Sequence, residues 1–417
     1  MGVARSSIIM ASGTIASRIL GFIRTVVLAL TIGVTTDAAD AFGVANQLPN
    51  NVYAIIAGGV LSAVLVPQIV KARSHDDDGH GYIDRLLTLA ITVFAVVTVA
   101  ATLAAPFLVS IYTTGWSAGQ LALATAFAYW CLPQLFFYGL YSMLGEVLNA
   151  RSYFGPYMWA PVLSNLVGLL GWIGFLVVFG ADPTGARTVE DWTQSEISLL
   201  AGSATLGVVA QALILFVAWR RIGIKFSFNF SWRGVGLRPA IKAAGWSLAM
   251  VLVSQIGGLV QTVVASRAVA DRGDGPAIAS IAAMVIAWLI FMLPHSVVTV
   301  SVATAYFTKM SEHVQKKQIH LMKADLRSSL RIVVLVNTFS SIALILLSLP
   351  VARVFVGEFA STVALGNVLF ATMFGLIPFG ILNLFFSATS FQVEASATPS
   401  SNEKCLRKTS STALTIN

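Results

Sequence analysis

The chain has 417 residues, of which 57% are hydrophobic and only 11% are charged. Soluble globular proteins carry about 25% charged residues, so this composition excludes an ordinary soluble enzyme or binding domain. The formal net charge is +8, and in a membrane protein an excess of lysine and arginine is typical of cytoplasmic loops. We therefore expect a membrane protein with no nucleic-acid partner.

Apolar segments long enough to cross a bilayer recur along most of the chain, which predicts an all-α polytopic membrane protein. The first segment is too long for the apolar part of a signal peptide, so we expect it to remain as a helix. The predicted spans are 7–33, 39–70, 84–112, 119–148, 157–180, 195–219, 240–268, 276–307, 328–352 and 361–388.

The loops between these spans alternate in charge. The fifth loop, 182–196, is net acidic, with Arg187 against four carboxylates. The sixth and eighth loops are basic and contain Arg220, Arg221, Lys225, Arg233, Arg238, Lys242, Lys309, Lys316, Lys317, Lys323, Arg327 and Arg331. The positive-inside rule then places the N-terminus, the even loops and the tail in the cytoplasm.

The longest polar interruption divides the spans into two groups. We expect an N-terminal six-helix lobe over 1–222, a basic cytoplasmic linker over 223–242 and an incomplete C-terminal lobe of about four helices over 243–388. Residues 389–417 form a polar tail that we expect to be disordered and cytoplasmic. Within the linker, residues 226–232 alternate apolar and polar side chains. They fit either an interfacial segment or an ordinary basic loop.

No combination of residues indicates an enzyme. The sequence has no His/Cys set at metal-binding spacing and no glycine-rich phosphate loop, so we expect no cofactor and no metal. Cys131 lies in an apolar segment and Cys405 lies in the polar tail. These two cysteines do not indicate a disulfide framework. His295 stands alone on an apolar helix, where a satisfied core histidine and a proton relay are both open interpretations.

Two arginines inside the first span are the most informative residues. A charge near the middle of a spanning helix costs about 2.5–3.5 kcal/mol and usually handles something charged. Arg18 and Arg24 are about 120° apart around an ideal helix and about 9 Å apart along it. Two guanidiniums suit a phosphate, which accepts bidentate hydrogen bonds. Alternatively, each could pair with Asp40 or Glu146, or Arg24 alone could extend to the membrane interface.

The second span also contains polar residues that are candidates for a functional site. Asp40 could be a counter-ion, a proton-coupling site or the N-cap of its helix. Asn50 follows on the same span, together with Gln47 and Asn51, and this set is polar enough to line a wet path.

Several motifs together resemble the MurJ/MviN lipid II flippase family of the multidrug/oligosaccharidyl-lipid/polysaccharide exporter superfamily. The stretch from Ser17 to Arg24 resembles the S-R-x-L-G-F-x-R signature of that family's first helix. The other matching motifs, in chain order, are Asp40-Ala41-Phe42, Leu48-Pro49-Asn50, Val66-Pro67, Leu148-Asn149-Ala150-Arg151 and Ala160-Pro161-Val162-Leu163-Ser164-Asn165.

The resemblance implies two helical lobes around a central cationic cavity, with about ten of fourteen family helices present. It implies that the protein moves the undecaprenyl diphosphate-linked peptidoglycan precursor, lipid II, from the inner to the outer leaflet by alternating access, for cell-wall synthesis. Arg18 and Arg24 would bind the diphosphate, with Ser17, Gly21 and Asn50 completing the site and Asp40 serving in coupling. The location would be the bacterial inner membrane, with membrane lipids and wall-synthesis proteins as partners.

The sequence departs from the family pattern at three positions. Tyr53, Ala54 and Leu289 stand where the family often has arginines, which predicts a less cationic cavity. The resemblance fades near Ser387, so we expect either a shortened form of the family or a truncated or out-of-frame reading of a longer gene, and we favour the second. Two other functions stay open: a drug/cation antiporter of the same superfamily, and a non-transporting scaffold of the wall-synthesis machinery.

Overall fold

A computed structural model describes residues 3–57, 80–151, 153–223, 226–231, 237–272, 278–316, 318–382 and 384. Every regular element in these ranges is helical, which confirms the predicted all-α class. The helices are α1 (Val3–Ile32), α2 (Asp37–Ile56), α4 (His80–Leu103), α5 (Ala105–Tyr112), α6 (Ala118–Cys131), α7 (Gln134–Ala150), α8 (Gly155–Phe179), α9 (Gln194–Arg221), α10 (Leu237–Arg272), α11 (Ile281–Pro294), a π-helical turn (His295–Thr299), α12 (Val300–Gln315), α13 (Ile319–Leu346), α14 (Ser348–Phe355) and α15 (Phe359–Met373).

Nine helical stretches in this part of the chain are long and apolar enough to cross a membrane. They correspond to nine of the ten predicted spans. The predicted second span, 39–70, begins as α2, and its continuation lies outside the described residues together with the Val66-Pro67 motif. The chain is therefore a multi-pass membrane protein.

Four predicted spans are interrupted, contrary to the sequence prediction. One of them, 361–388, divides at the turn 374–375, directly after α15. The span 84–112 divides into α4 and α5, and Pro106 lies in the first turn of α5. The span 119–148 divides at Leu132-Pro133 into α6 and α7. Proline lacks the N–H that continues a helix, which explains these two breaks. The span 328–352 ends early as α13 at Leu346, and α14 follows.

Local signals in the sequence set several helix ends. Gly33 ends α1 and Gly180 ends α8, each with a positive φ that suits glycine. At the start of α2, the side chain of Thr36 accepts a hydrogen bond from the backbone N–H of Ala39. Capping boxes begin α6 at Ser117 and α9 at Thr193. These local signals fix the starts of α2, α6 and α9 and the ends of α1 and α8.

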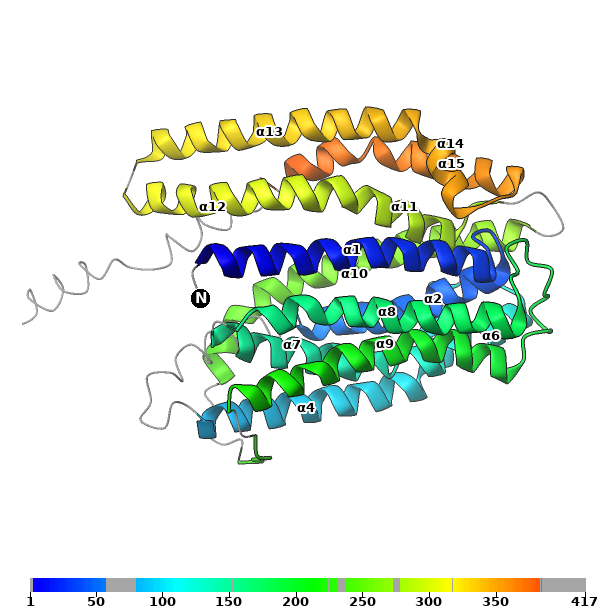
Figure 1. Ribbon diagram of the computed structural model, residues 1–417, viewed down its shortest axis with the longest axis horizontal. Helices are drawn as coiled ribbons and strands as arrows, with labels where there is room; N and C mark the ends of the chain where they lie inside the picture. The colour runs from blue at the N-terminus through cyan, green and yellow to red at the C-terminus, as the bar shows by residue number, and fades with distance from the viewer. Residues whose placement is uncertain are drawn as a thin grey trace, which may run out of the picture. The chain divides into compact units, whose positions relative to one another are not determined.

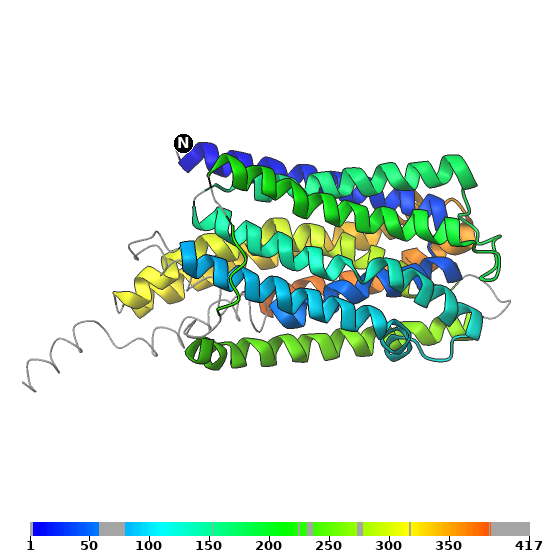
Figure 2. The same cartoon turned by 90° about the horizontal axis from the view of Figure 1, so that it is seen from below.

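The first compact unit comprises Met1–Val285 and Arg353–Ala364. Within it α8 packs against both α1 and α9, and α2 packs against α6 (Figure 1). The view from below shows α4 running alongside α7 (Figure 2). Phe42 contacts Phe127 and Trp172 edge to face at the centre of this core. Large aromatic residues thus fill the space between the helices that carry the predicted site.

The second compact unit comprises Ile286–Ala352 and Leu365–Asn417, with α12 packed along α13 (Figure 1). Asn337 is fully buried there and donates to Thr299 Oγ1 at 3.1 Å and to the Leu376 carbonyl at 3.3 Å. His295 is also buried, and its Nδ1 has no hydrogen-bond partner among the described residues. Its ring packs on Phe379, and both interpretations of this histidine stay open. The division of the chain at 223–242 stays a prediction.

Candidate functional site

The first-helix motif faces α8 through one side of α1. Ser17, Gly21 and Arg24 are spaced by four and three residues, so they share a helical face. Across from them stand Asn165 and Gly168 of α8. A Cβ atom built on Gly21 would lie 3.5 Å from Asn165 Nδ2, and one on Gly168 would lie 2.9 Å from Arg24 Nε. Glycine on each helix therefore leaves room for the polar side chain of the other.

Asn165 connects the two ends of the motif. Its Nδ2 donates to the Ser17 carbonyl at 2.9 Å and lies 3.3 Å from Ser17 Oγ. Its Oδ1 accepts from Arg24 Nη1 at 3.4 Å. Sequence reasoning did not assign a function to this asparagine, although it is the last residue of the A-P-x-x-x-N motif that contributed to the family resemblance.

The Arg24 guanidinium also lies over an aromatic ring. Its central carbon is 4.4 Å from the centre of the Trp172 ring, within the range of a cation–π interaction. Trp172 is 2% exposed, and its Nε1 donates to the Leu200 carbonyl at 3.0 Å, which fixes the ring. Arg24 is thus held on α8 by an amide oxygen and a ring face, both of which are electrically neutral.

The charge of Arg24 is not balanced by a carboxylate of the described residues. The predicted alternative, an ion pair with Asp40 or Glu146, does not occur at Arg24, and Arg24 Nε is buried with no hydrogen-bond partner in this part of the chain. Hydrogen bonds to charged groups contribute about 1.5–3 kcal/mol, so an unused donor on a guanidinium is energetically significant. Arg187 Nη1 is also buried without a hydrogen-bond partner among the described residues, so the lack of a described carboxylate partner is what sets Arg24 apart.

Asp40 lies against the start of α11, and the coupling role that the sequence left open for it stays a prediction. Its carboxylate is fully buried and accepts from Ser280 Oγ at 2.5 Å and from the backbone N–H of Ala282 at 2.9 Å. These groups form the N-terminus of α11, where a carboxylate complements the helix dipole. Asp40 does not cap its own helix, because Thr36 is the N-cap of α2. It caps α11 instead.

The remaining predicted residues are not part of the Ser17–Asn165–Arg24 contact. Arg18 is half-buried and, one residue after Ser17, projects from α1 about 100° away from it. Asn50 is exposed on α2, directly after the buried Pro49. Tyr53, at one of the positions where the family often has arginine, stacks against Phe94 at 6.0 Å. That position therefore contributes to packing.

A second arginine contacts the same helix, α8, near its other end. Arg187, in the loop 180–193, pairs through Nε with Glu196 Oε1 at 3.3 Å and lies over the ring of Phe175 at 5.6 Å. The backbone N–H of Arg187 donates to Asp182 Oδ2 at 3.0 Å. The acidic loop recognised in the sequence thus folds around its single arginine and neutralises it.

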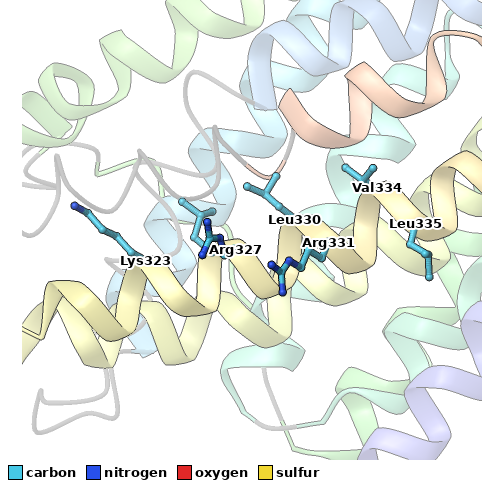
Figure 3. Close-up of a pocket in the computed structure, with 7 residues that line it drawn as sticks. Lys323, Arg327, Leu330, Arg331, Val334 and Leu335 are labelled. Atoms are coloured by element: carbon cyan, nitrogen blue, oxygen red, sulfur yellow. The ribbon is translucent and has the colours of Figure 1, made fainter.

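A basic cavity of about 830 Å³ lies along α13 in the second unit (Figure 3). Lys323, Arg327 and Arg331 are spaced by four residues and share one face of the helix. Leu326, Leu330, Val334 and Leu335 complete the described part of the lining. The sequence analysis treated these cations only as loop charges, because the start of α13 extends beyond the predicted span.

Comparisons with known proteins agree with this fold and these motifs. The family model described as "Lipid II flippase MurJ" matches residues 28–399, beyond Ser387, where the motifs fade. A probable lipid II flippase MurJ of Rhizobium meliloti (strain 1021) is 26% identical over 396 residues, covering 92% of this chain and 70% of the relative. Its counterpart in Rhizobium tropici is 26% identical over 386 residues, covering 90% and 68%.

Solved structures show the same fold. A structure titled "Lipid II flippase MurJ, inward closed conformation" matches with a TM-score of 0.71 at 20% identity, over 94% of this chain and 77% of that one. A MATE transporter in complex with MaD3S matches with a TM-score of 0.60 at 18% identity, over 94% and 81%. With the family model covering most of its length, the chain belongs to the lipid II flippase MurJ family.

Proposed function

We propose that this protein is a lipid II flippase, which moves the undecaprenyl diphosphate-linked peptidoglycan precursor from the inner to the outer leaflet by alternating access. Membership of the family and the multi-pass helical fold support the proposal. The observation that carries it is Arg24, an arginine on a spanning helix that neutral groups hold in place and no described carboxylate neutralises. Arg24 lies before residue 28, where the family match begins, so its proposed role rests on its contacts with Asn165 and Trp172.

Arg24 and Arg18 are proposed to bind the diphosphate. A guanidinium offers several N–H donors in a planar fork that matches phosphate oxygens, and it stays charged in an apolar environment. Asn165 holds Arg24 by Nη1 and leaves its Nε without a partner among the described residues. Ser17 and Gly21 position Asn165, and Asn50 is proposed to line the path of the polar headgroup. Among the described residues, no carboxylate that would repel the phosphates pairs with Arg24.

Asp40 is proposed to take part in coupling. Its carboxylate holds the N-terminus of α11 through Ser280 and Ala282, so a change in its protonation or partners would release that helix end. Substitution Asp40→Asn keeps the shape of the side chain but removes the charge that favours the helix dipole. We expect impaired transport by Asp40→Asn at a normal membrane level.

The orientation of the chain is also proposed, with the N-terminus in the cytoplasm. The basic face of α13 supports it, because cytoplasmic segments carry the excess of lysine and arginine. Single cysteines introduced at exposed Lys316 and at exposed Thr188 would report on the two sides. In whole cells, a membrane-impermeant thiol reagent should label position 188 and leave position 316 unlabelled. Labelling of 316 alone would reverse the topology.

The deciding experiment changes the charge beside Arg24 without changing its shape. Asn165→Asp replaces the amide by a carboxylate of nearly equal size, which would pair with Arg24 and cancel the charge offered to a diphosphate. If Arg24 binds the substrate, Asn165→Asp should lose transport even when normalised to the folded fraction. That normalisation is needed because the carboxylate cannot replace the hydrogen bond that Asn165 Nδ2 donates to the Ser17 carbonyl. The measurements are complementation of flippase-depleted cells, transport of a labelled lipid diphosphate in proteoliposomes, and thermal unfolding.

The outcome also separates the alternatives. If Asn165→Asp transports normally, Arg24 is a structural residue and the diphosphate-binding proposal is wrong. A drug/cation antiporter would export a cation, so a carboxylate at this position would not harm it. A scaffold would support wall synthesis without moving the labelled lipid at all, and its depletion would displace wall-synthesis proteins while the precursor kept its normal distribution between leaflets.

A further inference from the structure

An apolar crevice of about 290 Å³ lies between four segments of the first unit. Helices α4, α7 and α9 form its sides, and the segment 226–231 covers one end. Every described lining side chain is hydrophobic: Leu87, Ile91, Phe136, Leu140, Met143, Leu144, Phe216, Trp219, Phe226 and Phe228. The crevice shares no described residue with the Arg24 site.

The covering segment is held in place by polar contacts with α4. Ser227 Oγ donates to Asp84 Oδ2 at 2.7 Å, and the backbone N–H of Asn229 donates to Thr88 Oγ1 at 3.0 Å. Phe228 lies between these two anchored residues and contacts Phe226 edge to face at 4.9 Å. The alternation of apolar and polar residues noticed in the sequence thus directs phenylalanines to the crevice and polar groups to α4.

Two residues that line the crevice, Phe216 and Phe228, are also exposed, and the neighbouring positions Leu213 and Val217 of α9 are exposed and apolar as well. In a spanning helix such exposed apolar residues face lipid. A volume of this size equals about ten water molecules, but water enters only where polar groups receive its hydrogen bonds. Hydrocarbon is the filling that this lining accepts.

We propose that this crevice binds one acyl chain of a membrane phospholipid. The chain would contact Leu140, Phe216 and Trp219 inside, while the phosphate of the same lipid would meet Arg220. That arginine follows Phe216 by four residues, so it lies one turn further along the same helical face, and it is exposed. Asp84, the acidic group at this end, is engaged by Ser227.

A bound chain would fix the covering segment, which leads from α9 toward α10. Phe226 and Phe228 would gain a hydrocarbon partner in place of an empty space, and close contact with such a partner stabilises the arrangement. In this proposal, the bound lipid stabilises the position of the segment 226–231, which follows α9. This inference rests on the membrane location alone and is independent of the transported substrate.

Trp219 provides a direct test, because it lines the crevice yet is only 3% exposed. The protein would be reconstituted into phospholipid vesicles with or without bromine on the acyl chains, since bromine quenches tryptophan on contact. The fluorescence difference between the wild type and Trp219→Phe isolates the Trp219 signal. We expect brominated chains to quench that signal strongly, as they would an exposed residue such as Trp159.

Matched variants make the test decisive. Trp192 is comparably buried but lines no described part of the crevice, so the Trp192→Phe difference signal should be quenched little. Leu140→Trp would partly fill the crevice, whereas Val96→Trp adds the same side chain on the exposed face of α4. Lipids with a photoreactive acyl chain should label the Phe216 and Phe228 peptides several-fold less in Leu140→Trp and normally in Val96→Trp.

An unquenched Trp219 signal, or equal photolabelling of the crevice in both tryptophan variants, would overturn the proposal. Should Leu140→Trp fail to fold, the quenching of Trp219 in the wild-type background still decides the matter, because it needs only the conservative Trp219→Phe and Trp192→Phe variants. Loss of transport by any of these variants is a separate result, since the readouts here measure lipid contact and not flipping.

Discussion

Arg24 and Arg187 contact the same helix, α8, and have different kinds of partners. Each guanidinium lies over an aromatic ring of α8, Trp172 for Arg24 and Phe175 for Arg187. Arg187 pairs with Glu196 at 3.3 Å, whereas the nearest hydrogen-bond acceptor of Arg24 is the neutral amide of Asn165 at 3.4 Å. Glu196 of α9 neutralises Arg187. No carboxylate of the described residues pairs with Arg24, and the proposed diphosphate binding rests on this difference.

The largest expected effect comes from removing each arginine in turn. Arg24→Ala should lower transport about 10- to 100-fold, because charged hydrogen bonds contribute about 1.5–3 kcal/mol and each 1.4 kcal/mol is a factor of ten. Arg187→Ala should lower the unfolding temperature and leave transport by the folded protein unchanged. Transport in proteoliposomes, normalised to the folded fraction, measures both. If both variants lose transport equally, Arg24 and Arg187 do not have the different roles that we propose.

A smaller effect is expected from disturbing the position of Arg24 while keeping its charge. Gly168→Ala places a Cβ 2.9 Å from Arg24 Nε, and the flexible end of the arginine would move away from Trp172. We expect transport to fall a few-fold with little change in the unfolding temperature. Gly174→Ala on the same helix is the matched control, because a Cβ there meets nothing within 4 Å. If both variants transport alike, the position of Arg24 is unimportant.

The contribution of the Arg187–Glu196 ion pair to stability can be tested by thermal unfolding. Glu196→Gln keeps the shape of the side chain, and its amide oxygen can still accept from Thr193, but the ion pair with Arg187 is lost. Leaving a buried charged group without its partner costs about 1–3 kcal/mol. We expect a lower unfolding temperature and normal transport. A stability equal to that of the wild type would mean that the Arg187 charge, like that of Arg24, needs no carboxylate.

The smallest effect is expected at the exposed pair of Glu312 and Lys316, 2.6 Å apart. The hydrogen bond from Lys316 lowers the pKa of the Glu312 carboxyl below its ordinary value. A lowered folded-state pKa contributes stability that is present above the ordinary pKa of glutamate and is lost as the pH falls through the lowered value. Exposed pairs contribute little, so Lys316→Ala should leave the unfolding temperature at neutral pH unchanged. A loss as large as that of Glu196→Gln would contradict this.

Much of the fold follows from the sequence because each signal is local. The length of each continuous apolar segment predicts a membrane span. The capping residues Thr36, Ser117 and Thr193 set helix starts through contacts with residues only three positions away. The breaks at Ala104 and at Leu132-Pro133 were missed, because a continuous apolar run reads as one span even where proline divides it. In a membrane helix proline is often tolerated, so its effect depends on the neighbouring helices.

The sequence by itself determined that this protein spans a membrane several times and that two arginines of its first helix carry an uncommon charge. Those features depend on composition and spacing. Only the tertiary structure decided that Asn165 and Trp172 hold Arg24, that Asp40 caps α11, and that Glu196 neutralises Arg187. Each of these partners lies on another segment of the chain, and helix packing, which brings them within hydrogen-bonding distance, is not encoded by any one segment.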